Sequence, residues 1–507
     1  MRIGGLASGM DIDSLVNQLM AAERIPLNKM QQDKTLQEWE RDGFRDVNKK
    51  LLELDNMMLD MKLSHTYNPK TVNSSMEDAV TATGNSSASN GTYDIKVNQL
   101  ASSAINVSQD ALAIDPKESL TEQGIEPQAF EFFTFDEDGK EQHEYEIKEG
   151  DTLEDVLSTI TNDDNHVRAF FDEQSQKVVM ETTRPGNYNQ SDEFLGAEIG
   201  FDRQTNSSFI TDVLQIKNGR QDEFGNWHKV ETGGENAKFT YNGALEIESE
   251  ENNYTLNGVN FEFKNTTGDT SAKLTVNNDV DAAFDSIMEF VDKYNEVVET
   301  LNETQQEEKF RDYPPLTDEQ KEEMSEREIE LWEERAMSGI LRGESAISGG
   351  LFSMRQSWYS NVDTGGEITS LTQIGITTTS DYLDGGKLEV DEDELKKALR
   401  EDPDGVQALF SNDVEGVSRG LVNRLEDAVE QTMGRIEARA GNGMDTLENY
   451  TLGKRLKDMD DRISAFEDRL TRIETRYWNE FGQMEQAISR MNQQSMMLMN
   501  QFGGGSA

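Results

Sequence analysis

The sequence of 507 residues predicts an α+β multidomain fold, in which paired terminal helices and a helical-bundle stalk carry inserted β-rich head domains. Three observations predict this class. Both ends of the chain carry apolar residues at alternating spacings of three and four, the period of a packed helix. Residues 70–279 instead carry short alternating runs bounded by Gly, Asn and Asp, which are typical of strands and hairpins. The helical period then returns from residue 280.

The N-terminal end has two helical parts. Asp11 or Asp13 is expected to cap a first helix that carries Ile12, Leu15, Val16 and Leu19 on its apolar face. Pro26 predicts a break or a new first turn, because proline cannot donate a helical hydrogen bond. A second helix is then expected to reach the Asn68-Pro69 dipeptide. Its apolar positions, again three and four apart, are Phe44, Val47, Leu51, Leu54, Met58 and Met61.

The sequence pattern in the middle of the chain predicts strands first and helices later. The predicted strands are 93–97, 128–135, 143–147, 167–171, 177–182, 238–248, 254–263 and 272–276, with a short helix at 153–160 capped by Asp151 or Thr152. Residues 184–236 give no assignment. The predicted helices that follow are 280–301, 317–337, 344–359, 391–400, 403–410 and 417–440.

The C-terminal end carries the longest helical pattern, and its spacing is that of a coiled-coil seam. The seam positions are Leu456, Met459, Ile463, Phe466, Leu470, Ile473, Tyr477, Phe481, Met484, Ile488, Met491, Leu498 and Phe502, with Ser495 filling the place between Met491 and Leu498. The spacing slips once, because Ile473, Tyr477 and Phe481 lie four and four apart. Such a stutter locally relaxes the left-handed supercoil.

These elements predict four domains. They are a terminal coiled-coil leg (1–42 with 454–507), a helical stalk (43–77 with 280–453), a β-rich head (78–107 with 236–279) and an outer β-rich head (108–235). The pattern alone does not decide whether the seam packs within one chain or against another molecule.

The formal net charge of −51 is distributed unevenly. Residues 1–63 hold nine Lys/Arg and eleven Asp/Glu, and residues 454–507 hold eight of each, so −49 belongs to residues 64–453. A dense negative surface stays solvated and repels copies of itself, whereas neutral helices can pack together. The charge also argues against nucleic acid as a partner, because nucleic-acid binding needs a basic surface.

Other features of composition exclude further classes. There is no cysteine, so disulfides and thiolate chemistry are absent. No apolar run is long enough to span a bilayer, and residues 1–10 do not resemble a secretory signal peptide. Composition alone therefore suggests the cytoplasm, unless another export route exists.

The sequence offers little that resembles an active site. None of the four histidines, His65, His143, His166 and His228, lies in a metal-binding pair. The run 136–139 weakly resembles a calcium loop, but its glycine is misplaced and a hairpin turn is the better interpretation. We therefore expect no catalytic, cofactor-binding or metal-binding residues, and no enzyme activity.

One stretch is similar to a known family. Residues 5–16, which read GLASGMDIDSLV, resemble the start of the bacterial flagellar filament cap family, also called hook-associated protein 2. The likeness recurs in order at 19–23, 26–27, 91–101, 374–377, 403–410 and 476–485. It is missing only from about residues 105–235.

The resemblance implies a fold and a role. Family members pair their terminal helices as a leg in the filament tip, and a ring of a few copies, often five, retains exported flagellin and promotes its folding and insertion. The implied partners are further copies of the chain, flagellin, hook–filament junction proteins, the type III flagellar export apparatus and an export chaperone at the C-terminal helix. The implied location is extracellular, at the flagellar tip, reached without a cleaved signal peptide.

The residues expected to contact the filament or a partner helix lie on the apolar faces of the two ends. They are Leu6, Ile12, Leu15, Val16 and Leu19, with Leu456, Ile463, Leu470, Tyr477, Phe481, Ile488 and Leu498 opposite. The alternative for each is packing in the core of a single chain. Two other functions stay open: another axial flagellar protein, of the flagellin or junction type, and a surface adhesin whose β-rich head binds glycans. The negative charge makes acidic mucins poor ligands for such an adhesin.

Overall fold

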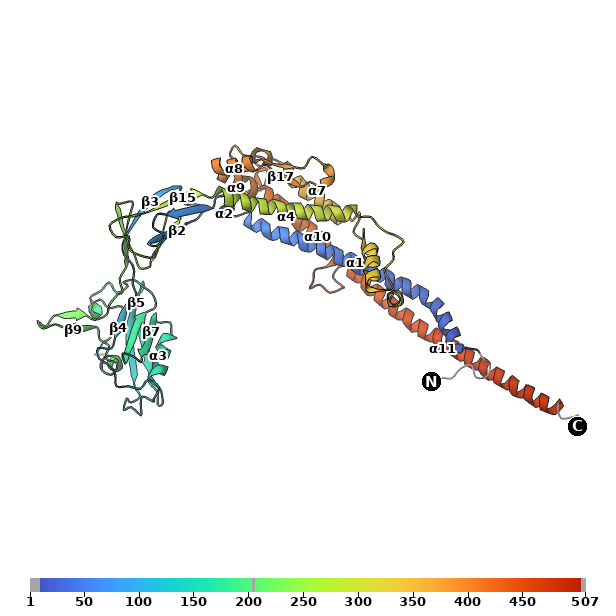
Figure 1. Cartoon of the computed structure of the whole chain (residues 1–507), viewed down its shortest axis with the longest axis horizontal. Helices are drawn as coiled ribbons and strands as arrows, with labels where there is room; N and C mark the ends of the chain where they lie inside the picture. Colours follow the sequence, from blue (N-terminus) through green and yellow to red (C-terminus); the bar gives the residue numbers. More distant parts are fainter. Residues whose placement is uncertain (1–9, 203–205, 503–507) are drawn as a thin grey trace. The chain divides into compact units, whose positions relative to one another are not determined.

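The computed structural model describes residues 10–202 and 206–502, which fall into two compact units. The helical unit comprises residues 10–67 and 280–502, and the β-rich unit comprises residues 68–279 (Figure 1). The α+β multidomain class predicted from the sequence is confirmed. The finer division into four domains stays a prediction.

The helical unit is built from two long terminal helices and a set of shorter ones. Its helices are α1 (Ile12–Asp60), α2 (Ser64–Tyr67), α4 (Val280–Gln306), α5 (Asp318–Glu322), α6 (Glu326–Met337), α7 (Ser345–Tyr359), α8 (Glu392–Glu401), α9 (Pro403–Ser411), α10 (Leu421–Ala440) and α11 (Thr451–Phe502). A hairpin of β16 (Ile376–Thr378) and β17 (Leu388–Val390) completes it.

The prediction that Pro26 breaks the N-terminal helix is wrong. Asp11 caps α1 by accepting the backbone N–H of Ser14 at 3.0 Å, and the helix then runs through Pro26 to Asp60. Pro26 and Ala22 are both exposed, so the carbonyl that loses its helical partner can bind water instead. Burial of Met20 and Leu27 on the opposite face stabilises the helix on both sides of the proline.

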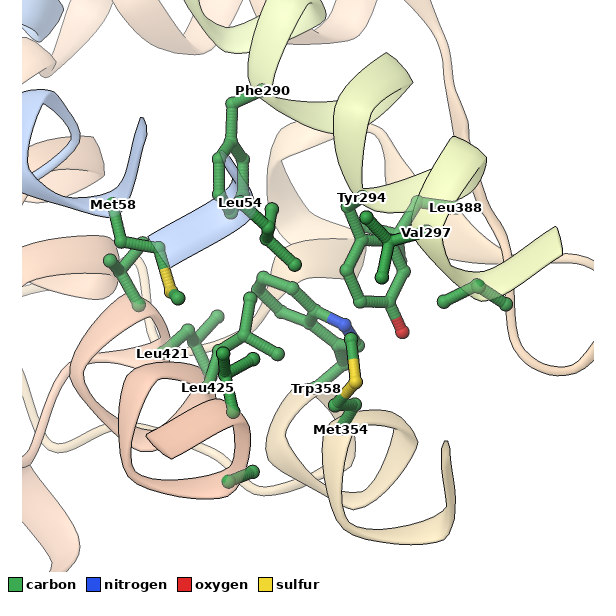
Figure 2. Packing of buried hydrophobic residues seen from close by; sticks show 14 of the residues in the cluster. Leu54, Met58, Phe290, Tyr294, Val297, Met354, Trp358, Leu388, Leu421 and Leu425 are labelled. Atoms are coloured by element: carbon green, nitrogen blue, oxygen red, sulfur yellow. The ribbon is translucent and has the colours of Figure 1, made fainter. Parts of the chain in front are cut away.

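The core of the helical unit forms where α1, α4, α7 and α10 meet (Figure 2). The predicted apolar positions of α1, Leu54 and Met58 among them, are fully buried here. The rings of Tyr294 and Trp358 meet edge to face with centroids 5.3 Å apart. The Tyr294 hydroxyl donates to the Gly386 carbonyl at 3.2 Å, so its polar end is satisfied inside the core.

Two predicted helices have different bounds. The polar helix expected at 317–337 is divided into α5 and α6, because Ser325 starts a new helix with a capping box to Glu328. The helix expected from Val417 begins only at Leu421, after the extended Gly420. A Cβ atom at Gly420 would lie 2.4 Å from the Phe410 carbonyl oxygen, so this close approach requires glycine.

The inner part of the β-rich unit contains two antiparallel sheets. Their strand orders are β1-β15-β3-β11-β12 and β13-β14-β2, with β1 (Lys70–Ser74), β2 (Val80–Gly84), β3 (Gly91–Gln99), β11 (Ala237–Tyr241), β12 (Leu245–Ser249), β13 (Asn253–Leu256), β14 (Val259–Phe263) and β15 (Ala272–Asn278). Alternate side chains of both sheets form one core around Ile95, Phe239 and Phe261.

Two stretches predicted as single strands are hairpins. The predicted strand 238–248 turns at Asn242-Gly243, and 254–263 turns at Asn257-Gly258. All four turn residues have positive φ, which Asn-Gly pairs adopt readily in the short loops of hairpins. Each Asn-Gly dipeptide was therefore a turn signal, and the alternation of apolar and polar residues around it had predicted one continuous strand instead.

The outer part of the β-rich unit follows the sequence prediction more closely. It contains β4 (Ile105–Val107), β5 (Ala129–Asp136), β6 (Gly139–Glu146), α3 (Leu153–Thr161), β7 (Val167–Asp172), β8 (Lys177–Thr182), β9 (Gly219–Gln221) and β10 (Trp227–Lys229). Residues 136–139 form the predicted hairpin turn, in which Asp136 accepts the backbone N–H groups of Asp138 and Gly139. Thr152 caps α3, as predicted, with Asp155 as its capping-box partner.

Residues 184–236, which gave no sequence assignment, contain only short elements such as β9 and β10, and buried carboxylates bind the backbone of the loops between them. Glu231 accepts the backbone N–H groups of Glu198 and Ile199 at 2.8 and 3.0 Å. Glu198 in turn accepts those of Tyr188 and Asn189, both at 3.0 Å. Burial raises the pKa of Glu231 from 4.5 to about 7 and also raises that of Glu198.

The buried Glu231 predicts a pH-dependent stability of this loop region. Between pH 4.5 and 7 the unfolded chain has lost a proton that the folded unit keeps, so stability falls as the pH rises through this window, by at most about 3 kcal/mol. Hydrogen exchange at Glu198 and Ile199, corrected for intrinsic rates, should show the loss. Glu231→Gln should remove it, whereas Glu246→Gln, at an exposed carboxylate, should not. The same slope in wild type and Glu231→Gln would contradict the assignment.

Candidate assembly interface on the terminal helices

The helices α1 and α11 lie side by side and run antiparallel (Figure 1). Lys34 pairs with Asp460 at 2.6 Å, and the Tyr477 hydroxyl donates to Glu23 at 3.0 Å. Residue numbers therefore rise along α11 as they fall along α1. The hydrogen bond to Asp460 raises the pKa of Lys34, so the Lys34 ammonium stays protonated over the whole physiological range. The predicted pairing of the chain ends is confirmed, and we name it the helix pair.

An apolar cluster joins the two helices. Its buried members are Ile12, Val16, Met20, Leu27, Ile463, Leu470 and Ile473, and Met30, Phe466, Tyr477, Trp478 and Phe481 pack partly buried against them. Each fully buried aliphatic side chain contributes about 1.5–3 kcal/mol relative to an exposed one. The cluster is therefore the main source of stability for the pair, since surface ion pairs contribute about 1 kcal/mol or less.

The residues predicted to form an interface fall into three groups. Ile12, Val16, Leu456, Ile463 and Leu470 are buried within the chain. Tyr477, Phe481 and Ile488 are half-buried. Leu15, Leu19 and Leu498 are exposed, by 37%, 38% and 53%. Leu6 lies outside the described residues. Packing within one chain thus accounts for the first group, and contact of the exposed leucines with a second molecule stays a prediction.

Two contributors to the pair were missed in the sequence. Met30 extends the α1 face beyond Leu27, but the expected break at Pro26 concealed that continuity. Trp478 lies one position beyond the seam residue Tyr477, so a pattern that allows one residue per turn does not include it.

A connecting segment before α5 covers the middle of the helix pair. The Gln32 side-chain amide donates to the Pro315 carbonyl at 2.8 Å, and Leu316 is buried. Arg24 lies 3.6 Å from Glu319. The middle of the pair is consequently shielded on one side, and the exposed surfaces lie toward the start of α1 and the C-terminal end of α11.

The C-terminal end of α11 continues past the start of α1 (Figure 1). Every side chain from Arg490 to Met499 is exposed, and Met497 and Met499 are each 74% exposed. Methionine is flexible and polarizable, so such a surface adapts to partners of irregular shape. A helix of this length without tertiary contacts is marginal in water. In the described part of the chain no helix is both long and apolar enough to cross a membrane.

One group of carboxylates in the helical unit lies close together. Asp55, Glu426 and Glu430 place ligand atoms within 4.8 Å of one another. Lys62 lies 2.5 Å from Glu426 and supplies a positive charge there, which compensates part of the repulsion. Burial raises the pKa of Asp55, and the nearby Glu426 raises it further. We therefore interpret the group as a structural ion-pair network between α1 and α10.

Known proteins match this chain over nearly its whole length. Family models described as the N-terminus and the C-terminus of flagellar hook-associated protein 2 match residues 8–104 and 234–493. The chain is 36% identical to flagellar hook-associated protein 2 of Halalkalibacterium halodurans, over 99% of this chain and 100% of that one. It is 24% identical to the Thermotoga maritima protein of the same name, over 100% and 96% of the two chains.

Solved structures resemble the fold. The crystal structure of domains D1-D2-D3 of the flagellar cap protein FliD from Escherichia coli covers 82% of this chain and 99% of its own, with a TM-score of 0.55 at 17% identity. At this identity the likeness shows the fold alone.

The helix pair predicts different costs for two leucine substitutions. Leu470→Ala removes a buried side chain and should destabilise the pair by about 2–4 kcal/mol. Leu498→Ala makes the same chemical change at an exposed position and should change stability by less than about 0.5 kcal/mol. Hydrogen exchange along residues 12–30 measures opening of the pair directly. Equal exchange in the two variants would contradict the described packing.

Proposed function

The chain belongs to the flagellar hook-associated protein 2 family, and from this premise we propose that it caps the distal tip of the flagellar filament. In this proposal several copies form a ring that retains exported flagellin and promotes its folding and insertion. The role is structural and requires no catalytic group.

The observation that carries the proposal is the uncovered end of α11 beside the helix pair. A fully exposed helical segment with four large apolar residues, Met496, Met497, Leu498 and Met499, is costly to maintain alone and gains stability from a helical partner. Residues 454–507 are formally neutral in a chain of net charge −51. Neutral helices of this kind can enter a packed polymer, whereas the acidic remainder stays solvated.

The partners follow from this role. They are further copies of the chain, flagellin, the hook–filament junction proteins and, before assembly, the type III flagellar export apparatus. An export chaperone at the C-terminal helix would cover the exposed methionines until export. The location is the filament tip outside the cell.

The competing assignment is a flagellin or a junction protein, which also pair their terminal helices. Electron microscopy of the purified chain added to filament ends separates these functions. A small ring at one end of each filament supports a cap, and self-polymerisation into long tubes overturns it.

The exposed leucines provide the mutational test. Leu15→Gln, Leu19→Gln and Leu498→Gln combined should leave thermal unfolding unchanged, because all three side chains are exposed, but should shorten or abolish filaments in a host that depends on this chain. The control combines Leu52→Gln, Leu245→Gln and Leu383→Gln, which are similarly exposed outside the apolar cluster that joins α1 to α11. Normal filaments in the first variant would remove these leucines from the docking surface.

The stutter gives a second test. Deleting residues 474–477 restores continuous three-four spacing and removes the hydrogen bond from Tyr477 to Glu23. If the stutter allows α11 to bend or change partner as the filament grows, the deletion should impair growth while the β-rich unit stays folded. Filaments of unchanged length would show that the stutter has no such role.

A further inference from the structure

Residues 308–338, which contain α5 and α6, leave the helical core after α4 and return to it before α7. The two ends of this segment meet, because the Ser338 hydroxyl donates to the Glu308 carbonyl at 2.6 Å. Next to this junction the Gln305 side-chain amide donates to the Leu341 carbonyl at 3.2 Å. The segment is therefore an addition to the core that departs and returns at one point, and we name it the strap.

The strap is a folded body rather than a loose loop. The Trp332 indole donates to the Pro314 carbonyl at 2.8 Å, and its ring lies 4.7 Å from the ring of Tyr313. Arg335 donates to the Tyr313 hydroxyl at 2.7 Å and lies over the same ring. These contacts join α6 to the extended residues before α5, so the strap keeps its shape by its own packing.

The strap lies across both members of the helix pair. The Gln32 side chain donates to the Pro315 carbonyl at 2.8 Å. A hollow of about 330 Å³ is lined by Leu27 of α1, Asp318 of the strap and Leu470 of α11. Because all three elements face one hollow, the strap crosses the pair at this level and widens it on one side.

Two segments of the pair extend past the strap. Residues 12–23 of α1 add about 18 Å and residues 475–502 of α11 add about 42 Å, at about 1.5 Å per residue. These segments carry the exposed Leu15, Leu19 and Leu498. The exposed leucines of the predicted interface therefore all lie on the far side of the strap from the helical core.

Charge and bulk both distinguish the strap from these segments. Residues 308–338 hold eleven Asp/Glu and five Lys/Arg, a net of −6, whereas residues 12–23 and 475–502 together hold four and two. Most of the strap carboxylates are exposed, and removing ionised carboxylates from water without partner cations is costly. Packed helices lie about 8–10 Å apart, and each added helix is about 10 Å across. The strap therefore does not fit between closely packed helices.

We propose that the strap is a stop that sets how far the helix pair enters a packed helical polymer. The proposal rests on the proposed docking of the pair in the flagellar filament. It narrows the predicted leg to residues 12–23 and 475–502, which fit neutral, apolar helices of flagellin. Residues from Arg24 onward stay outside, because the strap meets the end of the polymer first.

Photo-crosslinking on the intact chain tests the stop. A photo-reactive phenylalanine analogue replaces Gln18 or Lys29, which are exposed on the same face of α1 because eleven residues make about three helical turns. Each chain is added to the ends of short flagellin filaments and irradiated, and products that contain flagellin are identified by mass. The probe at Gln18 should crosslink to flagellin, and the probe at Lys29 should not.

Removing the strap should release the stop. A short Gly-Ser linker in place of residues 309–337 joins two ends that already meet, and the probe at Lys29 should then crosslink about as strongly as the probe at Gln18. Trp332→Ala removes the indole that orders the strap, so it should also raise crosslinking at Lys29. Phe352→Ala, at a 68% exposed ring on α7, is the matched control and should not.

The outcomes separate the stop from docking itself. Crosslinking at Lys29 while the strap is intact overturns the stop, and so does its absence once the strap is removed and hydrogen exchange along residues 12–30 shows a closed pair. If the deletion opens the pair, Trp332→Ala decides in the same way. No flagellin crosslink from the probe at Gln18 overturns docking, and the stop with it.

Discussion

The antiparallel pairing of α1 with α11 is the contact on which the helical unit depends. It joins residues more than 400 positions apart, as Tyr477 and Glu23 show. Neither helix has enough other buried surface along this region to stay ordered alone, because isolated helices are marginal in water. The same pairing closes the chain into a loop, so the whole β-rich unit is an insertion between two halves of one helical structure. Its cost is the closure entropy of a very long loop, which grows only slowly with length.

Charge and burial divide the chain in the same way. The terminal segments are close to neutral, and their apolar faces are buried against each other or uncovered at one end. The remaining residues carry almost all of the −51, and there the acidic groups are mainly exposed. Glu198 and Glu231 are exceptions, and each is compensated by backbone N–H donors rather than by a cation at hydrogen-bond distance. A negative surface that repels its own copies leaves the neutral ends as the place where close packing with other helices costs least.

The sequence predicted most elements of both units and the pairing of the ends, because helical and strand periodicity report directly on which faces are buried. The prediction failed where tertiary packing outweighed a local preference, and where a local turn signal was overlooked. Pro26 lies on the solvent side, so tertiary packing of Met20 and Leu27 outweighs the lost hydrogen bond. Asn242-Gly243 has a clear local turn signal that was outweighed by alternation. The order of the loops in 184–236 was beyond prediction, because it depends on hydrogen bonds from backbone N–H groups to the buried Glu198 and Glu231 that no period in the sequence encodes.

Burial of the α11 side chains decreases in steps toward the C-terminus. This gradient determines where the helix pair dissociates most easily. Ile463, Leu470 and Ile473 are buried, Tyr477 and Phe481 are half-buried, and residues 490–499 are exposed. Opening free energies follow buried contacts, so the pair opens first at its exposed end and last near Leu470. The stutter falls where burial changes, and a hydrogen bond from Tyr477 replaces part of the lost apolar contact there. A partner that binds the exposed end therefore competes only with the weakest part of the pair, and it can be exchanged without unfolding the core around Leu54 and Trp358.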